Sequence, residues 1–155
     1  MRGGAKLVHS VDSSAKAIEL TNRNVSLNFP GDTRHKAFCE DAFKFLEQAG
    51  DNYDLIILDP PAFAKHRGAL HNALKGYTRL NMKAMQKIQP GGILFTFSCS
   101  QAVDKEAFAL AVFSAAAQTG RKVRILARLS QPSDHPVSIY HPEGEYLKGL
   151  LLYVE

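Results

Sequence analysis

An uninterrupted apolar run that ends in an acid and two prolines is the feature that most constrains the fold of this chain. Residues 55–58 are all apolar, and the lack of alternation predicts a parallel strand over Tyr53–Leu58 that is buried on both faces. Pro60 and Pro61 cannot donate to a sheet, so the strand must end before them. The pattern therefore places Asp59 at the carboxyl end of a central strand, where open α/β sheets bind their ligands.

Strand and helix signals alternate along the rest of the chain. We expect strands over residues 6–12, 35–41, 53–58, 92–98, 122–129 and 147–154, and helices over 15–24, 42–49, 69–88 and 105–119. This alternation predicts a parallel sheet with helices on both faces. No helix signal separates the last two strands, so one of them is expected to run antiparallel. Without a linker or an internal repeat, we expect residues 1–155 to form a single domain.

Composition excludes several classes of protein. No apolar run approaches the ~20 residues that cross a bilayer, and the N-terminus lacks the apolar centre of a signal peptide, so we expect no membrane partner. Two cysteines in such a chain predict reduced thiols in a cytoplasm. The histidines show no metal-ligand spacing, so we expect no metal. The net charge of +4 permits a nucleic-acid partner without requiring one.

The basic residues are unevenly distributed. No acidic residue lies between Asp59 and Asp104. The same interval carries six basic residues, which are Lys65, Arg67, Lys75, Arg79, Lys83 and Lys87. They are either the solvated face of a helix or a set of phosphate contacts beside a site. The candidate nucleic-acid contacts are Lys65, Arg67, Lys75 and Arg79.

Four expected strands end in a polar or reactive group, namely Asp12, Asp41, Asp59 and Cys99. In a doubly wound sheet all four lie along one edge, which suggests a shared site. Asp12 and Asp41 have a simpler alternative, because each precedes an expected helix and can serve as its cap. The alternative for Cys99 is an inert, buried thiol. Cys39 is interpreted as a core residue or a pocket lining.

With these residues in place, the chain resembles class I S-adenosylmethionine (SAM)-dependent methyltransferases, and in detail the bacterial family that forms 5-methylcytosine in large-subunit ribosomal RNA. The resemblance covers nearly the whole chain. It rests on Gly4–Lys6, Val11–Ser13, Asn24-Val25, Glu40–Phe43, Asp54–Phe63, Gly76-Tyr77, Leu80-Asn81, Gly91-Gly92, Ser98–Ser100, Asp134–Pro136 and Pro142–Gly149. It implies a Rossmann-like, mostly parallel sheet with one antiparallel strand near the C-terminus.

The resemblance also implies a site for SAM. Asp12, with Ser13 beside it, would accept hydrogen bonds from the ribose hydroxyls of the cofactor. Asp41 would meet the adenine amino group, with Ala42 nearby. Asp59 and Pro60 would lie between the methionine end of SAM and the target base.

Cys99 would be the nucleophile of the implied reaction. Carbon 5 of cytosine becomes nucleophilic only after a group adds to carbon 6, and a thiolate suits that reversible addition. Asp59 could hydrogen-bond the ring meanwhile. The base must leave its stack, so the expected partner is a single-stranded or loop cytosine of ribosomal RNA.

The chain departs from the resembled family at its start. The first strand, the glycine-rich loop and the first helix are absent, and Gly3-Gly4 is typical of a helix-terminating turn. We therefore expect a C-terminal catalytic part with weak or no cofactor affinity alone. An unpaired strand in the sheet would invite self-association, so a homo-oligomer through that edge is an expectation as well.

Two alternative functions remain open. One is methyl transfer to an exocyclic amine or ring nitrogen, which uses an Asp/Asn-Pro-Pro-aromatic tetrad and needs no cysteine. Here Ala62 occupies the aromatic position and Phe63 comes one residue late, which favours carbon 5. The other is a non-catalytic remnant of the fold that binds RNA or a protein partner through the basic helix.

Overall fold

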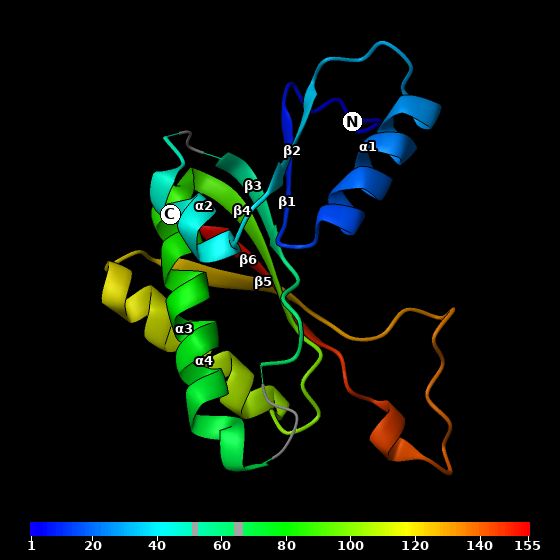
Figure 1. Cartoon of the computed structure of the whole chain (residues 1–155). Coiled ribbons are helices and arrows are strands. Elements are labelled where there is room, and N and C mark those ends of the chain that lie inside the picture. The colour runs from blue at the N-terminus through cyan, green and yellow to red at the C-terminus, as the bar shows by residue number, and fades with distance from the viewer. Residues whose placement is uncertain (51–52, 64–66) are drawn as a thin grey trace. The chain divides into compact units, whose positions relative to one another are not determined.

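Two β-sheets organise the chain, one in each of two compact units, residues 1–49 and 50–155 (Figure 1). The structure is a computed structural model and describes residues 1–50, 53–63 and 67–155. The expectation of a single domain over residues 1–155 stays a prediction.

The N-terminal unit is a two-stranded parallel sheet with its connecting helices. Its elements are β1 (Val8–Asp12), α1 (Ala15–Asn28), β2 (His35–Cys39) and α2 (Ala42–Gln48). The register pairs Val8 with His35 and Asp12 with Cys39, so both strands end at the same edge. Helix α1 extends beyond the expected end at residue 24, and the side chains of Ser26 and Asn28 donate to carbonyls one turn earlier. Pro30 and Gly31 follow soon after its end.

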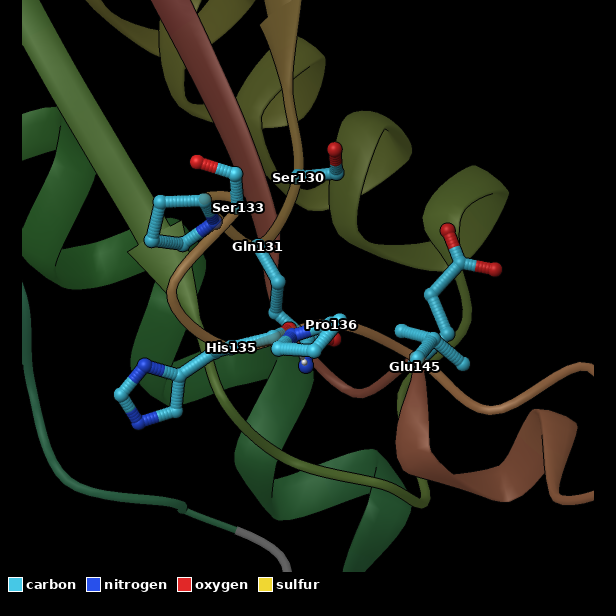
Figure 2. Close-up of a pocket in the computed structure, with 8 residues that line it drawn as sticks. Ser130, Gln131, Ser133, His135, Pro136 and Glu145 are labelled. Atoms are coloured by element: carbon cyan, nitrogen blue, oxygen red, sulfur yellow. Dashed lines mark hydrogen bonds between the residues drawn. The ribbon is translucent and has the colours of Figure 1, made fainter.

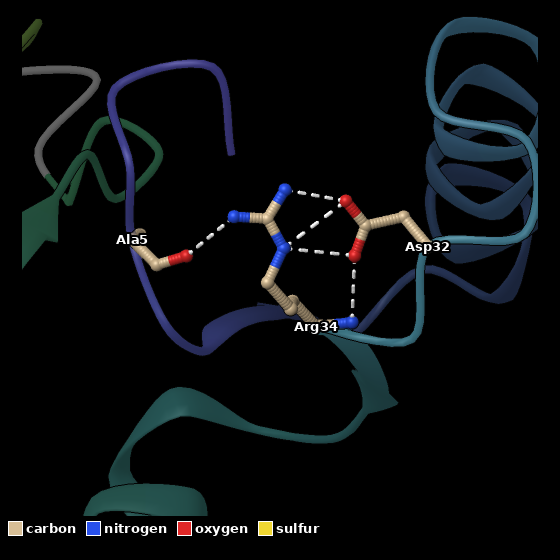
Figure 3. A network of polar contacts seen from close by, with 3 residues as sticks. All are labelled: Ala5, Asp32 and Arg34. Atoms are coloured by element: carbon tan, nitrogen blue, oxygen red, sulfur yellow. Dashed lines mark hydrogen bonds and ion pairs between the residues drawn. The ribbon is translucent and has the colours of Figure 1, made fainter.

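An ion pair between Asp32 and Arg34 stabilises the loop that leads from α1 into β2 (Figure 3). Arg34 Nε lies 3.0 and 3.1 Å from the two carboxylate oxygens of Asp32, and Arg34 Nη1 donates to the Ala5 carbonyl at 3.0 Å. The hydrogen bonds from Arg34 lower the pKa of Asp32 from 3.8 to about 2. The hydrogen bond from Arg34 to Ala5 therefore links this loop to the segment that precedes β1.

The C-terminal unit is a four-stranded mixed sheet with two long helices. Its elements are β3 (Tyr53–Leu58), the 3-10 turn η1 (Arg67–Ala69), α3 (Leu70–Lys87), β4 (Ile88–Ser98), α4 (Lys105–Thr119), β5 (Val123–Leu129), the 3-10 turn η2 (Pro142–Gly144) and β6 (Lys148–Val154). The strand order is β3-β4-β6-β5. Strands β3 and β4 are parallel, and β6 runs antiparallel to both β4 and β5. The predicted antiparallel strand is thereby confirmed.

Helices α3 and α4 pack on each other and cover one face of this sheet. The strand residues on that face, such as Leu94 and Leu152, are almost fully buried, as are Tyr77 and Met85 of α3 and Phe108 of α4. This layer is the main apolar core of the unit.

The prediction that Tyr53–Leu58 is a central strand buried on both faces is wrong in this sheet. Strand β3 is an edge strand of its sheet as described, and Leu55 and Ile57 are 50% and 61% exposed. The reason is that both helices of the unit pack on the opposite face. The bounds and parallel pairing of the strand are confirmed.

Strand β4 begins four residues before its expected start at Gly92. Tyr53 pairs with Ile88 and Leu55 with Ile93, so the Pro90-Gly91-Gly92 segment forms a bulge inside the strand. Gly91 has a φ of 86°, and a Cβ on Gly92 would lie 2.5 Å from a methyl group of Ile88. The glycines thus permit this bulge within the strand.

Candidate active site

Asp59 and Cys99 follow two neighbouring parallel strands of the C-terminal unit. Leu58 of β3 pairs with Thr96 of β4, so the two strands end at the same edge of the sheet. The Cys99 thiol lies 3.9 Å from the carbonyl oxygen of Pro60 and donates towards it. The predicted meeting of the Asp-Pro-Pro segment with Cys99 is therefore observed, whereas the catalytic roles of Asp59 and Cys99 stay predictions.

The serines on either side of Cys99 explain how its thiol is presented. Ser98 and Ser100 are fully buried, and both hydroxyls lie within hydrogen-bond distance of the Tyr77 hydroxyl, at 2.9 and 3.1 Å. Successive side chains at a strand end alternate in direction, so Cys99 faces away from this buried cluster. Cys99 is a free, half-buried thiol, which contradicts the alternative of a fully buried residue.

Phe63 fixes the segment that follows Asp59. Its ring packs at 4.7 Å from the ring of Tyr77. The fit is close, because a Cβ on Gly76 would lie 3.0 Å from the Phe63 ring. Phe63 is consequently part of the packing of α3, which leaves Ala62 as the residue next to the two prolines.

Lys148 is a functional candidate that sequence reasoning missed. It lies at the start of β6, opposite Ser98 in the sheet register, and is only 7% exposed. Its ammonium donates to the carbonyl oxygens of Ser100 and Tyr146, at 2.6 Å each. Its position within the Tyr-Leu-Lys-Gly segment was a usable signal, since a lysine inside an apolar strand must be accommodated by specific partners.

Asp12 and Asp41 lie together at one edge of the N-terminal sheet. Asp12 Oδ1 accepts from the Ser14 amide at 2.7 Å, and Asp41 Oδ1 accepts from the Phe43 and Lys44 amides at 3.0 and 3.1 Å. Asp41 is thus the N-cap of α2, as the simpler alternative predicted, whereas Ser14 caps α1. Because Asp59 and Cys99 belong to the other unit, the predicted single edge with all four groups stays a prediction.

The remaining predicted cofactor residues flank these two acids. Ser13 and Ala42 are exposed, and the Ser13 carbonyl accepts from the exposed thiol of Cys39 at 3.7 Å. Cys39 therefore lies at the edge of the sheet, whereas a core position was one expectation for it. The contacts of Ser13 and Ala42 with a cofactor remain a prediction.

The predicted RNA contacts are only partly described. Lys75 and Arg79 are exposed and lie one turn apart on α3. Arg67 belongs to the turn η1, which leads into the same helix, and Lys65 lies outside the described residues. Since α3 returns from the end of β3 to the start of β4, its first turns lie at the edge that carries Cys99.

A shallow cavity of about 320 Å³ opens in the long loop between β5 and β6 (Figure 2). Its wall includes Gln131, His135, Pro136 and Glu145. Gln131 also accepts from the Tyr146 amide at 2.9 Å and so links the two arms of the loop. The cavity therefore lies near Tyr146, shortly before the start of β6. This is the end of the sheet that also carries Cys99.

The described part of the chain holds neither a metal-binding cluster nor a membrane-spanning helix. No group of three or more His, Cys, Asp or Glu side chains there is arranged to hold a metal ion. No described helix has the length and apolarity to span a membrane.

Comparison with known proteins identifies the fold. No protein-family model matches the chain. "Ribosomal RNA large subunit methyltransferase I" of Tolumonas auensis is 43% identical over 155 residues, and the protein of the same name from Aeromonas hydrophila is 42% identical. Each alignment covers 98% of this chain, and the chain spans 39% of each relative's length.

A solved structure agrees with this similarity. The crystal structure of a protein assigned as a methyltransferase, complexed with SAH, superposes with a TM-score of 0.81 at 23% identity. It covers 98% of this chain and 40% of that one. The chain has the class I SAM-dependent methyltransferase fold, and the predicted α/β class with mostly parallel strands is confirmed.

Proposed function

We propose that this chain is the catalytic part of a SAM-dependent methyltransferase that modifies carbon 5 of a cytosine in ribosomal RNA. The observation that carries the proposal is the free, half-buried thiol of Cys99, which lies 3.9 Å from the Pro60 carbonyl at the edge where Asp59 ends its strand. The identity with the curated ribosomal RNA methyltransferases supports the substrate class.

SAM is the cofactor that the chemistry of the strand-end residues suits. The described hydrogen bonds of Asp12 and Asp41 use only Oδ1 of each carboxylate, so Oδ2 of each can accept from a ligand. In the proposed site Asp12 and Ser13 bind the ribose diol, and Asp41 and Ala42 bind the adenine. SAM supplies an electrophilic methyl group.

The reaction begins with Cys99. Its thiolate adds to carbon 6 of cytosine, and the electron pair of the ring double bond makes carbon 5 nucleophilic. Carbon 5 takes the methyl group, a base removes the proton from carbon 5, and the returning electron pair expels the thiolate. Asp59 donates or accepts a hydrogen bond at the ring, which supports protonation at nitrogen 3 during the addition. Pro60, whose carbonyl lies 3.9 Å from the Cys99 thiol, is a proposed cofactor-binding residue.

The target base must leave its stack to reach the thiol, so a single-stranded or loop cytosine is the proposed substrate. The candidate phosphate contacts are Lys65, Arg67, Lys75 and Arg79. Of these, Lys75 and Arg79 are exposed within the first ten residues of α3, where they can bind the RNA backbone.

The position of Phe63 favours carbon 5 over an amine. Transfer to an exocyclic amine needs an aromatic side chain that stacks on the base directly after the two prolines. Here Ala62 stands at that position, and the Phe63 ring packs on Tyr77 at 4.7 Å. The residue that could stack is therefore engaged in the core.

Cys99→Ala tests the proposal, with Cys39→Ala as the matched control. Each variant is incubated with SAM carrying a labelled methyl group and with unmethylated large-subunit ribosomal RNA, and the RNA is digested to nucleosides. We expect labelled 5-methylcytidine from the parent and from Cys39→Ala, at the low rate that the expected weak cofactor affinity allows, and none from Cys99→Ala. Full activity of Cys99→Ala, or label on a cytosine nitrogen, would refute the proposed chemistry.

Self-association through β3 is part of the proposal. The described sheet pairs β3 on one side only, and Leu55 and Ile57 are exposed beside it. Such an edge favours pairing with another chain. Sedimentation velocity is expected to show a dimer that Ile57→Lys disperses, and a monomeric parent protein would contradict this assembly.

A further inference from the structure

A β-turn in the long loop between β5 and β6 carries two large apolar side chains at its tip. The His141 amide donates to the Ser138 carbonyl at 3.0 Å, which closes the turn with Ile139 and Tyr140 as its central residues. The Ser138 hydroxyl accepts from the Tyr140 amide at 3.3 Å and supports the same conformation. Ile139 and Tyr140 are 89% and 86% exposed.

The composition of this turn is unusual for a turn that faces only water. Gly, Pro, Asn, Asp and Ser dominate turns, because their backbones and short side chains suit the tight conformation. A single exposed apolar residue is ordinary, whereas two adjacent ones at the tip of a turn form apolar surface that a partner can cover. The turn therefore has the character of a contact surface.

The loop that carries the turn is tied to the rest of its unit on both arms. Gln131 Oε1 accepts from the Tyr146 amide at 2.9 Å, which joins the arm before the turn to the arm after it. Lys105, at the start of α4, pairs with Glu145 at 2.6 Å. These contacts reduce the ordering that a partner must impose on the loop when it binds.

Both ends of the loop are anchored beside the end of β4. Lys148, the first residue of β6, pairs with Ser98, which directly precedes Cys99, and the end of β5 pairs with the next residue of β6. From there the loop projects outward beyond the strand ends (Figure 1). Tyr140 is eight residues from Lys148 in sequence, so roughly 28 Å is the most that can separate their backbones. An RNA strand that delivers one base to Cys99 can therefore meet the turn with another base.

The charges of the loop disfavour binding through phosphate. Residues 130–147 include three acids, Asp134, Glu143 and Glu145, and neither lysine nor arginine. The two histidines of the loop lie 3.7 and 3.4 Å from Asp134 and Glu143, so a positive charge on either is balanced locally. An RNA contact of this loop must then use the face of a base, on which an aromatic side chain stacks whatever the sequence.

We propose that Tyr140, with Ile139 beside it, is a stacking platform for an unpaired base of the RNA strand that carries the target cytosine. This inference rests on the proposed function, because it names a second contact of the same substrate. Tyr140 takes no part in the bonds that form and break. It binds a flanking base while the target base occupies the site at Cys99, and it adds affinity without reading the sequence.

The test measures how the 155-residue chain binds fluorescein-labelled oligocytidylate, by fluorescence anisotropy over a series of salt concentrations and without SAM. We expect Tyr140→Ala to weaken binding about tenfold. The slope of log affinity against log salt should stay unchanged, because stacking releases no counterions. Tyr140→Phe keeps the ring and should keep the affinity of the parent. Phe113→Ala is the matched control, since it removes an aromatic side chain that is 66% exposed on α4, and it should bind like the parent.

An abasic ribose-phosphate oligomer of the same length separates stacking from charge. We expect the parent and Tyr140→Ala to bind it equally, because it has the phosphates and lacks the bases. Equal affinity of the parent and Tyr140→Ala for oligocytidylate, or a loss that comes with a reduced salt slope, would overturn the inference. A Tyr140→Ala protein that binds RNA normally and loses a self-association of the parent would assign the turn to a protein contact instead. Failure of the proposed function is seen separately, as methylation that persists in Cys99→Ala, since neither binding experiment includes methyl transfer.

Discussion

Tyr77 is the residue that sets the geometry around the proposed nucleophile. Its hydroxyl joins Ser98 and Ser100, which stand on both sides of Cys99, and all three side chains are fully buried. Its ring also contacts Phe108 in an edge arrangement at 5.3 Å. One side chain of α3 thus fixes the end of β4 from which the thiol projects.

Removing that hydroxyl separates its polar role from its packing. Tyr77→Phe keeps the ring and leaves two buried serine hydroxyls without their shared partner, which costs about 1–3 kcal/mol. We expect this loss of unfolding free energy in urea titrations, together with slower methylation. Tyr140→Phe is the control, because Tyr140 is 86% exposed, and it should have the stability of the parent. Equal stability of Tyr77→Phe and the parent would show that the hydroxyl cluster does not support the site.

At the scale of elements, β6 joins the site to the core. It lies between β4 and β5, and its first residues, Lys148 and Gly149, pair with Ser98 and Phe97 of β4. A Cβ on Gly149 would lie 2.6 Å from the Phe97 ring and 2.9 Å from Leu129 Cβ. Because Gly149 has no side chain, β4, β6 and β5 can lie close together next to Lys148.

Gly149→Ala therefore overpacks this junction, because its Cβ would lie too close to the Phe97 ring and to Leu129 Cβ. We expect a loss of about 1–3 kcal/mol of unfolding free energy. The matched control is Gly144→Ala, whose Cβ meets only a Val137 methyl group, at 3.8 Å. A Gly149→Ala protein with the melting temperature of the control would show that the junction is looser than described.

The bounds of helices and strands were predicted well where a cap, a glycine or a proline sets them. Helix α4 has its predicted bounds, because Asp104 caps its start and Gly120 ends it with a φ of 67°. The same holds for the bounds of β3, which two prolines terminate. Burial could not be predicted in this way, since the apolar run at Leu55 and Ile57 does not reveal which face the helices cover. Lys148 was missed because its partners are two backbone carbonyls, which the sequence does not identify. Only its position inside a strand segment indicated that it needs specific partners.

At the scale of the whole molecule, charge distribution determines how RNA would approach. The net charge is only +4, so binding depends on where the basic residues lie. Lys75 and Arg79 are exposed on the part of α3 near the site, whereas Lys122 precedes β5 at the opposite edge of the sheet. We therefore expect RNA that places a base at Cys99 to pass Lys75 and Arg79.

A salt titration tests this arrangement. We expect Lys75→Met with Arg79→Met to weaken RNA binding and to reduce the slope of log affinity against log salt by roughly 1.4, about 0.7 for each lost phosphate contact. Lys122→Met removes one charge from the other edge and should change the slope little. Equal slopes for the two proteins would place the RNA elsewhere, and salt-sensitive binding without methyl transfer would favour a non-catalytic role.

The most direct test of the central claim is to trap the bond between Cys99 and the target base. Fluorine at carbon 5 of cytosine replaces the proton that must be removed, so methyl transfer to this base leaves the thiol attached to carbon 6. With RNA that contains 5-fluorocytidine, mass spectrometry should find a SAM-dependent covalent complex at Cys99 that is absent in Cys99→Ala. Methylation of ordinary RNA without such a complex, or a complex that persists in Cys99→Ala, would contradict the account.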